Sequence, residues 1–269
     1  MKLISYERSL QVWALLQHKQ QASFPLISAV LKGLQKGKVF VDDEAAPTCV
    51  FVLTNYGFSQ YFLLKDDSFT EDFIDFLVES DKIPYYFHLY DPIYDIDERL
   101  MQKGLVPKLR ERKQLRYLSK DPVIVNPMPN GYSLHDMNEI EFNSFEQFNL
   151  DLGSRFWSSR NAFIKNAFGK CIVYNEGTPV SVCYSACIAN GIAEIDIATL
   201  IDHQGKGLGK IVTQAFINES ISKNIIANWD CFSENRPSLR VAEETGFKVL
   251  KTYSFLSVYN KKKHEKESN

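Results

Sequence analysis

The sequence predicts a mixed α/β fold, of the α+β kind, divided into two domains. Apolar residues at helical spacings of three and four alternate along the chain with short strand-like runs rich in aromatic and β-branched residues. A proline-rich stretch, residues 119–131, interrupts this alternation near the middle of the chain. A strand, a glycine-rich turn and a helix then follow one another directly at residues 192–221. The 269 residues suffice for two medium-sized domains.

In the first half, helices and strands are predicted to alternate without a glycine-rich phosphate loop. The elements expected there are helical residues 5–35 with a break at Phe24-Pro25, strands 38–41, 48–54 and 60–64, helix 69–78, strand 84–89, helix 91–101 and strand 109–118. Three prolines and Gly131 lie in the following stretch, which suits a linker. We therefore expect domains at residues 1–125 and 126–260, with a disordered polar tail at 261–269.

In the second half, three antiparallel strands are predicted to lead into the glycine-rich turn. The elements expected there are strand 132–134, helices 136–148 and 163–168, strands 170–174, 179–189 and 192–200, helix 208–221, strand 225–231, helix 238–245 and strand 253–259. Asn175-Glu176-Gly177-Thr178 and Asn190-Gly191 are the tight turns of this meander.

Composition excludes several classes of function. A formal net charge of -2 gives no overall attraction for nucleic acid, and no apolar run reaches the roughly 20 residues that span a bilayer. Charged residues near the N-terminus argue against a secretory signal. The five cysteines form no C-x-x-C pair, as expected for reduced thiols in the cytoplasm. Cys183 and Cys187 share one strand face as metal ligands would, but core burial is the favoured interpretation, and we expect no metal site.

The glycine-rich turn at residues 204–209, Gln-Gly-Lys-Gly-Leu-Gly, is the most informative stretch of the sequence. Glycines let the backbone adopt unusual dihedral angles and approach a ligand closely. The first N–H groups of the following helix are unpaired, and together with the helix dipole they attract phosphate. The turn therefore predicts a site for the pyrophosphate of a nucleotide-like cofactor.

Residues 132–259 resemble GNAT-superfamily N-acyltransferases. The turn fits that family's Q/R-x-x-G-x-G/A loop, and Asn235 stands eleven residues before Gly246-Phe247, as in the family pattern. Trp229-Asp230-Cys231 and the segment 242–247 resemble more narrowly the two-domain group that includes zwittermicin-resistance acetyltransferases. This resemblance implies a GNAT fold in the second half and a degenerate GNAT-like domain in the first.

The resemblance also implies acetyl-CoA as co-substrate and assigns residues to it. Backbone groups of the turn would hold the pyrophosphate, the strand before it would pair with the pantetheine arm, and a splay between that strand and residues 226–231 would admit the thioester. The residues expected to bind the cofactor are Ile197, Thr199, Gln204, Gly205, Lys206, Gly207, Leu208, Gly209, Lys210 and Asn235. For Asn235, a plain helix cap is the alternative interpretation.

Amine acylation needs an unprotonated amine, which a general base can provide. Glu194 lies where many family members carry a catalytic acid, and Asp196 shares its face if the strand is regular. We therefore predict catalytic roles for Glu194 and Asp196, against the alternative that Glu194 merely faces solvent. A bulge in this strand would put the two side chains on different faces.

One position departs from the family pattern, because Ala242 stands where many members have the tyrosine that protonates the leaving thiolate. Tyr184, Ser233, Cys231 or solvent are the candidate donors instead. We expect an acetyl-CoA-dependent N-acetyltransferase acting on the primary amine of a small molecule, such as an amine-bearing antibiotic or metabolite, in a monomer or homodimer. The alternative is a non-catalytic acyl-CoA-binding or protein-interaction module on the same scaffold.

Overall fold

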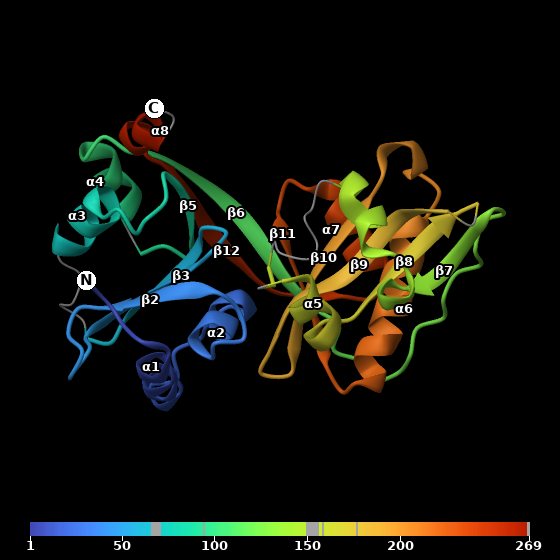
Figure 1. Cartoon of the computed structure of the whole chain (residues 1–269), viewed down its shortest axis with the longest axis horizontal. Helices are drawn as coiled ribbons and strands as arrows, with labels where there is room; N and C mark the ends of the chain where they lie inside the picture. Colours follow the sequence, from blue (N-terminus) through green and yellow to red (C-terminus); the bar gives the residue numbers. More distant parts are fainter. Residues whose placement is uncertain (66–70, 94, 149–155, 158, 176, 268–269) are drawn as a thin grey trace. The chain divides into compact units, whose positions relative to one another are not determined.

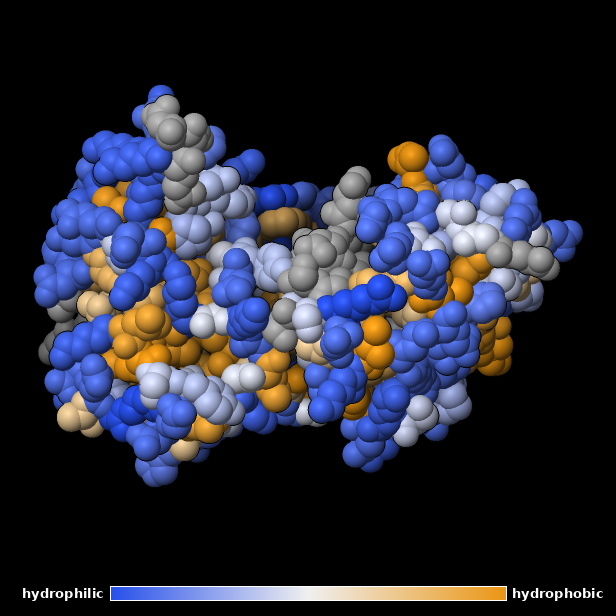
Figure 2. Space-filling view, viewed as in Figure 1, coloured by the Kyte–Doolittle hydropathy of each residue, from blue (hydrophilic) through white to orange (hydrophobic). Residues whose placement is uncertain are grey.

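A computed structural model describes residues 1–65, 71–93, 95–148, 156–157, 159–175 and 177–267, and these form two compact units. Unit 1 comprises residues 1–112 and 253–269, and unit 2 comprises residues 113–252. Each unit combines a sheet with helices, which confirms the predicted mixed α/β fold (Figure 1). The face drawn in Figure 2 is largely hydrophilic with scattered apolar areas.

Unit 1 is a sheet with strand order β1-β2-β3-β4-β5-β12 and its own helices. Its elements are β1 (Lys2–Leu3), α1 (Tyr6–His18), α2 (Pro25–Leu31), β2 (Gly37–Val41), β3 (Cys49–Thr54), β4 (Phe58–Leu63), α3 (Glu71–Glu79), β5 (Tyr86–Tyr90), α4 (Ile96–Gln102), the first residues of β6 (Val106–Arg116), the last residues of β12 (Lys248–Tyr259) and α8 (Lys261–Glu267). The strands are antiparallel except β4 and β5, which pair in parallel after the α3 crossover. The predicted start of α3, residues 69–70, lies outside the described residues.

The C-terminal tail is helical, although its composition predicts disorder. The ammonium group of Lys263 donates hydrogen bonds to three carbonyl groups at the end of α3 and in the turn after it, namely those of Leu77, Ser80 and Ile83, at 3.4, 2.7 and 3.1 Å. A lysine there stabilises a helix C-terminus because the last carbonyl groups lack intrahelical partners. The tail is therefore a fixed part of unit 1.

Unit 2 has the strand order β6-β11-β10-β9-β8-β7. Its elements, besides the end of β6 and the start of β12, are β7 (Tyr132–Asp136), η1 (Met137–Glu139), η2 (Phe142–Phe148), α5 (Arg160–Asn166), β8 (Gly169–Tyr174), β9 (Thr178–Ala189), β10 (Ile192–Thr199), η3 (Ile201–His203), α6 (Leu208–Ser222), β11 (Ile226–Phe232) and α7 (Arg236–Glu244). Strands β7 to β10 form the predicted antiparallel meander. The predicted helix 136–148 is instead a pair of 3-10 helices. The first is capped by Asp136, whose backbone N–H donates to the carboxylate of Glu139 at 3.3 Å.

The proline-rich stretch belongs to unit 2, which begins at residue 113. Side chains of α6 hydrogen-bond the stretch along its length. Asn218 bonds both the N–H and the carbonyl of Val123, at 2.8 and 2.9 Å, and Gln214 accepts from the N–H of Asn126 at 2.9 Å. These amide side chains satisfy backbone groups that no strand partner pairs, which makes the stretch a strap over α6.

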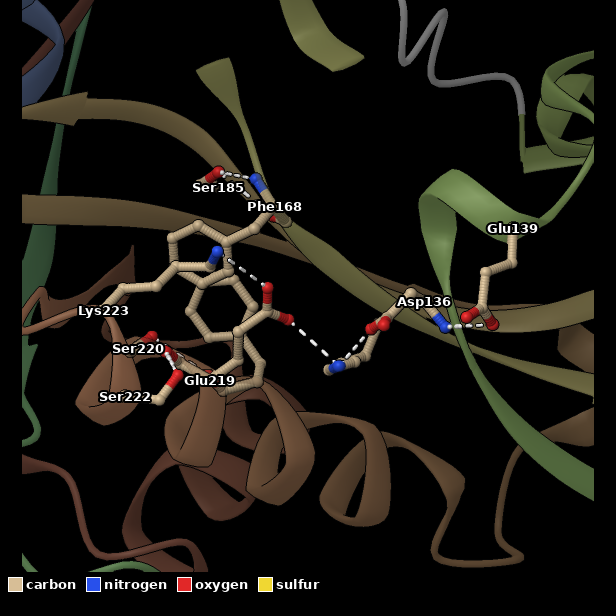
Figure 3. Close-up of polar contacts among 10 residues, drawn as sticks. Asp136, Glu139, Phe168, Ser185, Glu219, Ser220, Ser222 and Lys223 are labelled. Carbon is tan, nitrogen blue, oxygen red and sulfur yellow. Dashed lines mark hydrogen bonds and ion pairs between the residues drawn. The ribbon is translucent and has the colours of Figure 1, made fainter. Parts of the chain in front are cut away.

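Helix α6 is the centre of the core of unit 2. Nine of its residues are buried, and its apolar side chains pack against β8, β9, β10 and β11. An ion cluster fixes its far end to the edge of the sheet: Asp136 and Glu219 point toward each other in Figure 3, and the ammonium of Lys170 bonds both, at 3.1 Å from Glu219. Lys223 lies 3.4 Å from the same glutamate. The N-terminus of α6 is thereby held at a defined place beside the sheet.

Candidate functional site

The parallel strands β10 and β11 separate part-way along their length. They pair in register at three successive positions, the last being Glu194 opposite Asn228. Strand β10 nevertheless continues to Thr199 and β11 to Phe232. The splay expected from the sequence is therefore present, and Glu194 and Asn228 stand where it begins.

A bulge lies beside this point on the neighbouring strand β9. Cys187 pairs with Glu194 while Ser185 pairs with Ile195, so β9 carries one extra residue, Ala186. Because the extra residue is on β9, the alternation of β10 is preserved, and Ala193 and Ile195 both belong to the core around α6. Glu194 and Asp196 consequently lie together on the opposite face of the sheet.

The glycine turn connects the end of β10 to α6. Gly205 and Gly207 have φ of 74° and 78°, a region that side chains other than glycine rarely adopt. Gly207 caps α6, and its carbonyl accepts the first helical hydrogen bond, from the N–H of Ile211 at 3.1 Å. The N–H groups of Leu208, Gly209 and Lys210 precede that bond, so they are available to an anion.

A cavity of about 750 Å³ opens between this turn, the separating strands and the start of α7. It is lined by Ile197, Ala198, Thr199, His203, Gln204, Gly205, Gly207, Leu208, Gly209, Lys210, Trp229, Asn235, Arg236, Pro237, Ser238, Arg240, Val241 and Glu244. Nine of the ten residues predicted to bind a cofactor line it. A cavity of this size is in the range of small-molecule and cofactor sites.

Lys206 is the predicted residue that does not line the cavity. Its ammonium donates to the carbonyl of Asp202 at 2.9 Å and lies 5.8 Å from the centre of the Tyr132 ring. Gln204 lines the cavity, but its side chain donates to the carbonyl of Thr199 at 3.1 Å. This bond anchors the start of the turn to the end of β10 and occupies one backbone group of the strand edge.

Asn235 combines both interpretations that the sequence offers. Its side-chain oxygen accepts from the N–H of Ser238 at 3.3 Å and so caps α7. Asn235 also lines the cavity, and none of the described residues accepts a hydrogen bond from its side-chain nitrogen. Trp229 forms the neighbouring wall, with its indole N–H donated to the hydroxyl of Ser238 at 3.0 Å.

Basic side chains gather where α6 and α7 meet at the cavity. Glu244 accepts from Arg240 at 2.7 Å and lies 3.5 Å from the ammonium of Lys210. The hydrogen bond from Arg240 is the main reason that the pKa of Glu244 is lowered. Arg236 also lines the cavity, which leaves this rim with three cations and one anion. Such a rim favours ligands that carry phosphate.

Glu194 is buried, with 8% of its surface exposed, so the solvent-facing interpretation is wrong. Its carboxylate accepts from the side-chain amide of Asn228 at 2.8 Å, and the oxygen of that amide accepts from Arg116 at 3.1 Å. Sequence analysis missed Asn228 and Arg116. The available signal was a polar residue in the otherwise apolar strand Ile225 to Trp229, whose partner could not be known.

Asp196 lies on the same face and accepts from the hydroxyl of the buried Tyr184 at 2.6 Å. Tyr184 belongs to an aromatic cluster on this face, which also contains Phe145, Trp157 and Phe163. These rings are buried, so the hydroxyl of Tyr184 ties Asp196 to the core on this face of the sheet. Neither Glu194 nor Asp196 lines the cavity at the glycine turn. Ser233, at the end of β11, has a buried hydroxyl that bonds none of the described residues.

The cysteines are free and buried, in agreement with the core interpretation of Cys183 and Cys187. Burial raises the pKa of both thiols, and the charge of Glu194 adds to this effect at Cys187. Within the described ranges, no three metal-binding side chains of His, Cys, Asp or Glu come together. No described helix is both long and apolar enough to cross a membrane.

The chain matches the family profile of GNAT acetyltransferases over residues 15–256, which includes the glycine turn, the splayed strands and the start of α7. The chain belongs to the GNAT acetyltransferase family. This GNAT protein is 27% identical over 234 residues to the uncharacterized N-acetyltransferase YdfB of Bacillus subtilis, a match that covers 85% of this chain and 88% of that protein.

Two solved structures show the same fold as this GNAT chain. One is a GCN5-related N-acetyltransferase-like protein from Streptococcus suis, with a TM-score of 0.69 and 20% identity over 94% of this chain and 100% of the other. The second is a tandem GNAT protein from the clavulanic acid biosynthesis pathway, with a TM-score of 0.65 and 11% identity over 96% and 97%. The family and its N-acetyltransferase relative identify the protein as an acyltransferase.

Proposed function

We propose that this acetyltransferase transfers an acetyl group from acetyl-CoA to the primary amine of a small molecule. The observation that carries the proposal is the cavity between the glycine turn and the separated strands, with a buried carboxylate where the separation begins. The backbone N–H groups from Gly205 to Lys210 would hold the pyrophosphate, and the edge of β10 at Ile197 and Thr199 would pair with the pantetheine arm. Asn235 would donate its free amide N–H to the same arm.

In the proposed reaction, Glu194 accepts a proton from the bound ammonium group, which frees the nitrogen lone pair. The nitrogen then attacks the thioester carbonyl carbon and forms a C–N bond. As the tetrahedral intermediate collapses, the C–S bond breaks and the nitrogen releases its second proton to solvent. The CoA thiolate takes up a proton from solvent or from a nearby hydroxyl, because Ala242 is wholly buried in the core and offers no donor. Asp196 adds negative charge that attracts a cationic acceptor to this face.

The acceptor is proposed to be a compact amine, including amine-bearing antibiotics or metabolites. One observation supports this class: the carboxylates of Glu194 and Asp196 lie on one face of β10, where they would attract a cationic amine. The narrower resemblance to zwittermicin-resistance acetyltransferases belongs to this proposal as well.

Binding and turnover test the proposal separately. Acetyl-CoA at about 100 times its dissociation constant should raise the free energy of unfolding by about 2.7 kcal/mol, detectable as a higher Tm. A panel of polyamines, amino acids and aminoglycosides, assayed for thiol release from acetyl-CoA, should contain an acceptor. Absence of both the Tm shift and thiol release would reject the proposed function.

The substitution E194Q tests the general base. Loss of a positioned base should lower kcat by about 10²-fold or more while the affinity for acetyl-CoA stays unchanged. The matched control is E243Q, an exposed glutamate of the same unit, which should behave as wild type. Equal kcat values for E194Q and E243Q would refute the role of Glu194.

A further inference from the structure

Three polar side chains from three adjacent strands form a line across the sheet where β10 and β11 separate. Glu194 comes from β10, Asn228 from β11 and Arg116 from the end of β6. The flanking residues Leu115, Ala193 and Ala227 all belong to the core around α6. The three polar side chains therefore share the opposite face, which is the face that carries Asp196.

The chemistry of the two end groups fixes the orientation of the amide between them. A guanidinium can only donate hydrogen bonds, and an ionised carboxylate can only accept them. The Asn228 oxygen must face Arg116, at 3.1 Å, and its nitrogen must then face Glu194, at 2.8 Å. Asn228 is completely buried, so water does not compete for either bond.

Charge reinforces this arrangement. Burial lowers the pKa of Arg116, whereas the negative charge of Glu194 acts in the opposite direction and raises it. An arginine stays protonated near neutral pH even so. The guanidinium therefore places a positive charge in interaction with Glu194 as well as orienting the amide that holds it.

We propose that Arg116 and Asn228 are positioning residues for the transfer reaction, and that they hold the Glu194 carboxylate in a single orientation at the start of the strand separation. This inference rests on the proposed function, because it concerns the base of that reaction. It requires neither Arg116 nor Asn228 to touch the substrate.

Arg116, Asn228 and Glu194 all belong to unit 2. Strand β6 runs from residue 106, in unit 1, to Arg116, in unit 2. Its end lies beside β11, because the N–H of Tyr117 donates to the carbonyl of Ala227 at 3.1 Å. The three side chains are therefore contributed by neighbouring strands of one compact unit.

A double-mutant cycle in the full-length chain tests the inference. The variants are R116Q, E194Q and R116Q/E194Q, assayed for thiol release with the best amine of the panel. R116Q should lower kcat by about ten- to a hundredfold because the base is misplaced, and leave KM for acetyl-CoA within about twofold. R116K keeps the charge and should recover part of the loss, and R116Q should add little in the E194Q background.

A different pattern would overturn the inference. If R116Q costs the same factor with and without Glu194, Arg116 acts through general stability and not through the base. If E194Q inactivates the enzyme and R116Q nevertheless keeps the wild-type kcat, the inference is also overturned. These results differ from failure of the proposed function, in which no amine is acetylated and acetyl-CoA does not bind.

A spectroscopic measurement tests the hydrogen bonds between Arg116, Asn228 and Glu194 without any amine substrate. The side-chain amide protons of Asn228, assigned in NMR spectra by their absence in N228D, should exchange slowly with solvent because the group is buried and bonded. In R116Q these protons should shift and exchange faster. Unchanged shifts and exchange in R116Q would show that Arg116 does not hold the amide.

Discussion

The substitution G207A separates the phosphate-binding role of the glycine turn from its effect on stability. Gly207 has φ of 78°, and an added methyl group would meet no atom within 4 Å. The cost of folding therefore comes from the left-handed backbone alone, about 1–2 kcal/mol. The methyl group would lie in the open space at the N-terminus of α6, where the pyrophosphate is proposed to bind.

Gly191 provides a matched control in the same unit. Its φ is 71°, and an added methyl group there also meets nothing within 4 Å. G191A and G207A should lower Tm alike, by a few degrees. If G207A weakens acetyl-CoA binding tenfold, the stabilisation given by a ligand at about 100 times the wild-type Kd falls from about 2.7 to about 1.4 kcal/mol. G191A should keep the full stabilisation.

Thermal melts with and without acetyl-CoA, supported by titration calorimetry, measure both effects. The reasoning is refuted if G207A binds acetyl-CoA as tightly as G191A does. The phosphates would then lie away from the first turn of α6, and the function of the turn would be conformational only.

Two further predictions concern the stability of unit 1. Burial, with the charges of Arg112 and Arg110, lowers the pKa of His88 to about 4, so the unfolded chain binds a proton near pH 6.5 that the folded chain refuses. The free energy of unfolding should therefore fall by up to about 3 kcal/mol as pH drops from 6.5 to 4. Urea unfolding should show that this free energy depends less on pH in H88N than in the wild type. The same pH dependence in both proteins would contradict the lowered pKa of His88. K263M removes the cap of α3 and should lower the free energy of unfolding by about 1–2 kcal/mol, whereas K262M, at an exposed position, should not; equal Tm values for the two variants would dismiss the cap.

Local patterns in the sequence carried most of the fold of unit 2. The glycine turn, the apolar helix α6 and the meander of strands each follow from spacings within about twenty residues, and the structure has all three. The tail was predicted wrongly because its order depends on carbonyl groups at Leu77 to Ile83, distant in sequence from Lys263. Composition reports only the charge of such a segment and not its partners.

In the candidate site too, the residues set by local sequence could be predicted, whereas the contacts between distant positions could not. The turn residues were named from their order, whereas the Arg116–Asn228 contact joins positions 112 residues apart. No spacing rule relates those positions, since strand neighbours in a sheet are set by tertiary packing. Burial of Glu194 was equally out of reach, because it depends on β11 and β9 covering both sides of its strand.

The two units share one strand arrangement but differ in what lies where their parallel strands meet. In each, an antiparallel meander ends in a strand that is joined through a helix to a parallel neighbour, β4 to β5 in unit 1 and β10 to β11 in unit 2. In unit 1 Phe58 pairs with His88, and their rings are tilted with centroids 5.2 Å apart. The imidazole stacks on Phe255, with centroids 5.0 Å apart. In unit 2 Glu194 pairs with Asn228, beside strands that separate. Ring packing fills the junction in unit 1, whereas in unit 2 a bonded carboxylate stands at the start of the separation. The same topology therefore gives a packed core in one unit and, in the other, the strand separation at which we propose the reaction takes place.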